Sequence, residues 1–188
     1  MPQKKMAWPR QPSDRQWVKP EGDDPRTLYQ MLMVSQERFG GEPCIGYIPS
    51  PGMARVHLTY NEFGDLATAT AKGLRDIGVE KGDRVAIIID NSVEWAALSY
   101  GANALGAAYT AMYTHQHGKD WAYILADATP KVVAVANTEV LDKLCGALPD
   151  DGWPASGVIL LGDEPANQLP PEGVEVRSWT DFVKAGRA

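Results

Sequence analysis

Cysteine is scarce in this sequence, and no stretch of it is strongly basic. The 188 residues include 2 cysteines, Cys44 and Cys145, which do not have the spacing of a disulfide framework. Such scarcity is typical of a reducing compartment, so we expect a cytoplasmic protein. The formal net charge is -6, and lysine and arginine do not gather on any predicted helix face. Because nucleic-acid binding requires a basic surface, the composition excludes nucleic acid as a partner.

Long hydrophobic runs are also absent. Residues 1–20 lack the apolar core of a secretory signal. No Asp, Glu, Lys or Arg occurs between Glu94 and Lys119, but this stretch is rich in Ala, Gly, Ser, Thr, Asn and Tyr. A membrane-spanning helix needs about 20 strongly apolar residues. The stretch therefore predicts a buried helix followed by a buried strand, and no transmembrane segment.

Proline and charge dominate residues 1–25, where Trp8 and Trp17 are the only large apolar side chains apart from methionine and valine. This composition predicts an extended N-terminal arm. From residue 26 to residue 188, short apolar runs alternate with amphipathic stretches, which is typical of one α/β domain.

The alternation predicts a three-layer fold, with a mostly parallel sheet between helices. Residues 43–49 and 56–60 read as an N-terminal hairpin, and residues 163–176 as a surface loop. The remaining expected strands are 85–89, 106–112, 130–136 and 156–162, and the expected helices are 26–40, 59–77, 91–105, 119–128, 138–148 and one beginning at 180.

Helix starts carry recognisable capping signals. Thr59 and Glu62 have the spacing of a capping box, in which each side chain satisfies a backbone N–H at the helix start. Asn91 precedes Glu94 at the same spacing and predicts a cap for the next helix. In the first helix, four residues follow one another at helical spacing: Leu28, Met31, Leu32 and Ser35.

Catalytic motifs are missing. The two glycines Gly101 and Gly106 have the separation found in a phosphate-binding loop, but Ala107 and Ala108 follow them in place of Lys and Ser or Thr. There is no Gly-x-Ser-x-Gly motif, and the histidines have no evident serine or cysteine partner. We therefore predict no catalytic, cofactor-binding or metal-binding residue in this segment.

One loop follows a strand at the edge where open α/β sheets bind ligands. It contains Tyr113, Thr114 and His115, which are candidate substrate-lining residues; a solvated loop is the preferred interpretation. His115 and His117 have the spacing of two histidine ligands in a metal site. No cysteine or carboxylate accompanies them at ligand spacing, so no metal is expected.

The order of short phrases along the chain resembles a known family. These phrases are LTYNE (58–62), GVEKGDRVAI (78–87), NSVEW (91–95), GA (106–107), YILAD (123–127) and KVV (131–133). Together they resemble the N-terminal region of acyl-CoA synthetases of the adenylate-forming AMP-binding superfamily. These motifs are most similar to those of medium- or long-chain fatty acyl-CoA ligases. The family often has a proline after the strand where this chain has Met112 and Tyr113.

The resemblance implies a parent enzyme that joins a fatty acid to CoA through an acyl-adenylate, using ATP and Mg. It also implies that residues 26–188 are the N-terminal subdomain, truncated before the phosphate loop, with the remainder of the synthetase as its partner. Such a segment is a scaffold that is not catalytic alone. A stand-alone, non-catalytic α/β module that binds a small ligand or a partner remains the alternative.

Overall fold

The computed structural model describes residues 25, 27–49, 52–149, 152–162 and 166–187. Apart from Pro25, the arm predicted for residues 1–25 lies outside the described residues.

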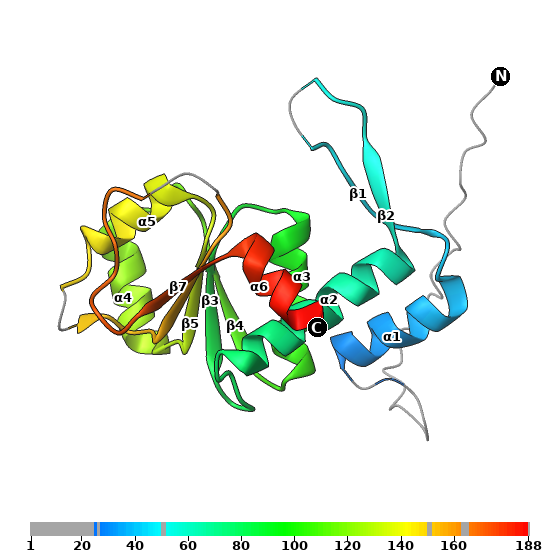
Figure 1. Ribbon diagram of the computed structural model, residues 1–188, viewed down its shortest axis with the longest axis horizontal. Coiled ribbons are helices and arrows are strands. Elements are labelled where there is room, and N and C mark those ends of the chain that lie inside the picture. Colours follow the sequence, from blue (N-terminus) through cyan, green and yellow to red (C-terminus); the bar gives the residue numbers. More distant parts are fainter. Residues whose placement is uncertain (1–24, 26, 50–51, 150–151, 163–165, 188) are drawn as a thin grey trace, which may run out of the picture.

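A five-stranded parallel sheet forms the centre of the protein (Figure 1). Its strand order is β4-β3-β5-β6-β7, and every neighbouring pair is parallel. The strands are β3 (Arg84–Ile88), β4 (Ala108–Met112), β5 (Val132–Val135), β6 (Gly157–Leu160) and β7 (Glu175–Ser178). The α/β class and the parallel sheet predicted from the alternating pattern are confirmed.

Helices cover both faces of this sheet, which gives the three layers expected from the sequence (Figure 1). The helices are α1 (Leu28–Phe39), α2 (Tyr60–Asp76), α3 (Val93–Ala104), α4 (Gly118–Ala128), α5 (Thr138–Cys145) and α6 (Trp179–Arg187). One face packs against α2, α3 and α6 through residues such as Leu74, Leu98 and Phe182. The other face packs against α4 and α5 through Trp121 and Leu141.

The first two strands form a separate hairpin that extends away from the body of the protein (Figure 1). Strands β1 (Pro43–Tyr47) and β2 (Val56–Thr59) pair antiparallel, as predicted, with an irregularity between Pro43 and Ile45. Its base packs through Ile45 and Leu58 on a small core around Phe63. Two strands alone are marginally stable, so this base fixes the hairpin to α2.

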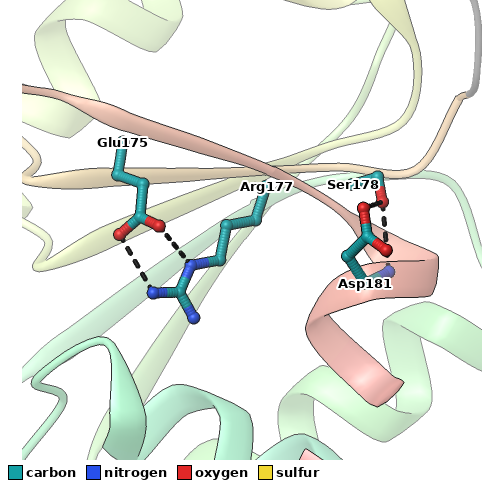
Figure 2. Close-up of polar contacts among 4 residues, drawn as sticks. All are labelled: Glu175, Arg177, Ser178 and Asp181. Atoms are coloured by element: carbon teal, nitrogen blue, oxygen red, sulfur yellow. Dashed lines mark hydrogen bonds and ion pairs between the residues drawn. The ribbon is translucent and has the colours of Figure 1, made fainter. Parts of the chain in front are cut away.

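Strand β7 corrects the prediction that β6 is the last strand, and it includes Glu175 and Val176, which were predicted as the end of the surface loop of residues 163–176. Its only strongly apolar residue is Val176, so its sequence carries little strand signal. Pairing with β6 supplies the stabilisation that its own pattern lacks. The strand leads directly into α6, where Ser178 Oγ accepts a hydrogen bond from Asp181 N at 3.1 Å (Figure 2).

One further local prediction was wrong. The residue that caps α3 is Ser92, not Asn91: its Oγ accepts a hydrogen bond from Trp95 N at 3.1 Å. Both residue types suit the position, and the extended backbone of Ser92 decides between them. In α1, Leu28 and Met31 are about half exposed, because only one side of this helix meets α2 and α3.

The capping box at the start of α2 is confirmed. Glu62 N donates to Thr59 Oγ1 at 3.2 Å, and Thr59 N donates to the Glu62 carboxylate at 2.8 Å. Hydrogen bonds from the backbone and then from the side chain of Thr59 lower the pKa of Glu62.

Acid should weaken this cap. A carboxyl whose pKa is lower in the folded state stabilises the fold above its unfolded pKa, near 4.3, and loses this contribution as the pH falls through the folded pKa. Urea unfolding at successive pH values should show a smaller acid loss of stability for Glu62→Gln, which keeps an acceptor oxygen but does not ionise. Parallel pH profiles for the two proteins would contradict this assignment.

Close contact between α2 and α6 depends on Gly73. A Cβ at this position would lie 2.8 Å from the ring of Phe182 and 3.1 Å from its backbone oxygen. Phe182 is fully buried, so its ring has no free space to move into. Gly73→Ala should therefore lower the free energy of unfolding by about 1–3 kcal/mol, despite the better helix propensity of alanine.

Gly64 provides a control in the same helix. The three atoms nearest to an added Cβ there all belong to the amide end of the Gln36 side chain, which can move aside. Gly64→Ala should be neutral or stabilising in the same urea titration. Equal destabilisation by the two substitutions would show that the contact with Phe182 is not the cause.

Candidate functional site

The loops that follow β3 and β4 meet at the carboxyl edge of the sheet. Because the two strands are parallel neighbours, Asp90 after β3 and Thr114 after β4 come together. Thr114 Oγ1 donates a hydrogen bond to Asp90 Oδ1 at 2.8 Å. This bond joins two segments that are 24 residues apart in the sequence.

The loop after β4 is held in a defined turn. Gln116 N donates to the Tyr113 carbonyl at 3.2 Å, and Tyr113 N donates to Gln116 Oε1 at 2.9 Å. The indole Nε1 of Trp121, a buried residue of α4, also donates to the Tyr113 carbonyl, at 3.1 Å. Backbone and side-chain bonds therefore fix the position of this loop from inside the protein.

Lys143 of α5 adds a contact from the other side of the loop. Its Nζ donates to the Gln116 carbonyl at 2.5 Å and lies 4.5 Å from the centroid of the Trp121 ring. No sequence pattern pointed to Lys143. A lysine 27 residues from its partner carries no local signal, because the contact depends on how α5 packs beside α4.

A hollow of about 460 Å³ opens between the ends of β3 and β4. Apolar side chains, including Trp95 and Met112, form much of its lining, and Asp90, Asn91 and Tyr113 supply the polar groups. Tyr109 contacts Trp95 edge to face, with ring centroids 5.9 Å apart. The single ionisable carboxylate makes this lining unsuited to a phosphate and better suited to an uncharged or apolar group.

The three predicted substrate-lining residues take different positions. Tyr113 lines the hollow and is 73% exposed. Thr114 is half-buried and holds the two loops together through Asp90. His115 is exposed and is not part of the lining of this hollow. Their predicted role as substrate contacts remains a prediction.

A second hollow, of about 570 Å³, lies where the hairpin faces the start of α3. It is lined by Tyr47, Ile48 and Arg55 from the hairpin side and by Ser92 and Glu94 from the helix side.

Among the residues that the structure describes, no group of three or more His, Cys, Asp or Glu side chains is arranged so that it could hold a metal ion. Within the same residues, none of the helices has both the length and the apolar character needed to cross a bilayer.

Comparison with known proteins gives the family. The family model described as AMP-binding enzyme matches residues 34–184, which is well over half of the chain. This protein therefore belongs to the AMP-binding enzyme family.

Individual relatives agree with this membership. The long-chain-fatty-acid–CoA ligase ACSBG2 of Rattus norvegicus is 26% identical over 171 residues, covering 90% of this chain and 24% of the relative. The long-chain-fatty-acid–CoA ligase FadD13 of Mycobacterium tuberculosis is 41% identical over 78 residues, covering 42% of this chain and 16% of the relative. This chain thus spans about a quarter or less of the length of these relatives.

A solved structure shows the same fold. The putative long-chain-fatty-acid CoA ligase of Rhodopseudomonas palustris superposes with a TM-score of 0.67 at 25% identity. The match covers 83% of this chain and 36% of the other. The parallel sheet and its helices therefore correspond to part of a larger ligase.

Replacing Lys143 should loosen the loop after β4. Lys143→Met keeps most of the aliphatic stem but removes the hydrogen bond to Gln116 and the charge above Trp121. A cation–π contact contributes about 0.5–1 kcal/mol at an exposed site, and the lost hydrogen bond adds to it. Amide hydrogen exchange of residues 113–117 should therefore become about five- to tenfold faster.

Lys119→Met is the matched control, because this exposed lysine precedes Trp121 on the same helix. It should leave exchange in the loop unchanged. Similar exchange rates in the unaltered protein and in Lys143→Met would show that Lys143 does not hold the loop.

Proposed function

We propose that this chain is the N-terminal scaffold segment of an ATP-dependent fatty acyl-CoA ligase. The parent enzyme would convert a fatty acid and ATP into an acyl-adenylate and pyrophosphate, and then form the thioester with CoA. The observation that carries the proposal is the family match over residues 34–184 in a chain about a quarter as long as its ACSBG2 relative. That relative and FadD13 are both long-chain-fatty-acid–CoA ligases by name.

The segment would act by holding parts of the substrate groove in place. A parallel sheet buried between helices gives a rigid support, and the two loops at its carboxyl edge form a wall of the substrate groove. In this arrangement Tyr113, which lines the hollow, would contact the substrate, and Thr114 and His115 of the same loop would face the part of the groove that the remainder of the synthetase completes. The apolar contacts offered by Trp95 and Met112 suit a hydrocarbon chain, whereas Asp90 disfavours a carboxylate or phosphate close to it.

ATP, Mg and CoA would be bound by the remainder of the synthetase. Stabilising the charge of a transferring nucleotide needs a metal ion, hydroxyl groups and backbone N–H groups arranged around the phosphates. The sequence offers no phosphate-binding loop for this purpose, and no step is assigned to any residue of this segment.

The exposed hairpin supports a partner of this kind. Tyr47, Ile48, Met53 and Val56 are between 37% and 57% exposed although all are large and apolar. A two-stranded hairpin gains stability when further structure packs on it. The remainder of the synthetase would cover these side chains.

The chain alone should not catalyse adenylation. In an ATP–pyrophosphate exchange assay with fatty acids, we expect no exchange above background from the 188 residues. Protein recovered from source cells with an antibody against this chain should be several-fold larger than 20.5 kDa and should catalyse the exchange. Exchange by the 188 residues alone would overturn the scaffold assignment.

The same antibody separates the two candidate functions. A native protein of 20.5 kDa that supports no exchange would favour the stand-alone, non-catalytic binding module instead. In that case the hollow beside Tyr113 becomes the first place to search for a ligand.

A further inference from the structure

Two neighbouring residues of α5 each hold a different loop of the protein. Lys143 Nζ donates to the Gln116 carbonyl in the loop after β4, at 2.5 Å. Asp142 binds the crossover segment (residues 166–174), which follows β6 and leads into β7. Its two carboxylate oxygens accept one hydrogen bond each, from Asn167 Nδ2 at 2.7 Å and from Gln168 N at 2.8 Å. One helix therefore carries attachments for two loops that are distant in the sequence.

The contact at Asp142 is a charged one. The hydrogen bond from the side chain of Asn167, followed by the one from the backbone of Gln168, lowers the pKa of Asp142. The carboxyl is therefore ionised at neutral pH. Hydrogen bonds to an ionised acceptor are stronger than those between neutral groups, so the crossover segment has a firm attachment at this point.

Helix α5 depends on tertiary contacts for its position. It has 8 residues, and isolated helices shorter than about 12–15 residues are marginal in water. Val140, Leu141 and Leu144 are buried and belong to the core on this side of the sheet. This inward face leaves Asp142 and Lys143 on the outer side of the helix. The two loop contacts therefore act together on the same outer side.

The start of α4 packs on α5 with no free space between them. A Cβ at Gly118 would lie 2.8 Å from the Cβ of Ala147 and 3.3 Å from the Lys143 backbone oxygen. Lys143 Nζ also lies over the ring of Trp121, whose indole donates to the Tyr113 carbonyl. Elements packed this closely do not shift independently. A displacement of α5 is therefore transmitted to the start of α4 and to the loop before it.

The crossover segment follows the other side of the same helix (Figure 1). Ala166 and Val174, near its two ends, pack against the core that contains the buried face of α5. Between them, Pro170 is buried, and Gln168 Oε1 would lie 3.8 Å from a Cβ added at Gly146. The crossover segment is thus in contact with α5 through side chains as well as through the bonds to Asp142.

We propose that α5 couples the loop after β4 to the crossover segment, so that loosening either one loosens the other. Asp142 and Lys143 are positioning residues in this device. When one of them loses its loop, α5 loses an attachment on its outer side, and its shift weakens the contact that the other residue makes. The coupling connects the rim of the hollow at Tyr113 with the segment that leads into β7. Coupling between two equilibria is reciprocal, so it acts equally in both directions.

Amide hydrogen exchange, measured for single residues by NMR in the 188-residue chain, tests the coupling. Asp142→Ala removes both acceptor oxygens from the crossover segment. It should make exchange of the Tyr113 and Gln116 amides, which are hydrogen-bonded within the loop after β4, about two- to fivefold faster. Alanine is a better helix former than aspartate, so a weaker helix cannot cause this acceleration. In the opposite direction, Lys143→Met should accelerate exchange of the Gln168 amide by a similar factor.

Each variant has a matched control. Glu139→Ala removes the same charge from an exposed position one turn earlier in α5, and it should leave the Tyr113 and Gln116 amides unchanged. Lys119→Met should leave the Gln168 amide unchanged. Urea unfolding verifies that the variants are folded. If Asp142→Ala is not, Asp142→Asn, which keeps one acceptor oxygen, should give a smaller acceleration in the same direction.

Faster exchange at both distant loops, with both controls unchanged, supports the proposal. Faster exchange confined to the loop that each altered residue itself binds overturns it. An effect in one direction only, or an equal effect of Glu139→Ala, overturns it as well. Because the measurement uses neither ATP nor a fatty acid, its outcome is separate from that of the ATP–pyrophosphate exchange assay.

Discussion

Burial of the central strands on both faces is the constraint on which the rest of this structure depends. The residues of β5 and β6 and most of β3 are buried, and their side chains alternate between the two faces of the sheet. Each strand therefore needs a helical layer on either side. The parallel connections from β3 to β4, from β4 to β5 and from β5 to β6 pass through α3, α4 and α5. The loops are left at the two ends of the strands. For this reason, the polar residues after β3 and β4 share one edge although they are distant in sequence.

The layered fold could be predicted because this constraint produces short apolar runs in the strands and apolar residues at helical spacing in the helices. Thr59 and Glu62 mark the start of α2 without help from distant residues. The sequence was less informative where stabilisation comes from a neighbour. Strand β7 has one strongly apolar residue and depends on β6, and the choice between Asn91 and Ser92 as the cap depends on a backbone angle.

For the candidate site, too, some features could be predicted from the sequence and others could not. Its location after β3 and β4 followed from the rule for open α/β sheets, which needs only the order of elements. The bond between Asp90 and Thr114 needs the relative position of the two strands, and the contacts of Lys143 need the packing of α5. These two hydrogen bonds join residues 24 and 27 positions apart, and no periodic pattern relates the residues. Tertiary packing, not local spacing, determines them.

The well-packed centre of the sheet and the exposed groups at its periphery have one physical origin. A sheet covered by helices satisfies its inner strands first, so unmet contacts accumulate at the outermost strand and at the hairpin. Tyr109 and Ala111 are exposed on the outermost strand, β4, and Tyr47 and Val56 expose apolar surface on the hairpin. The first requirement is directional and is met by a strand, whereas the second is not directional and is met by any close-packed surface. A sheet edge and an exposed apolar surface therefore favour different kinds of partner.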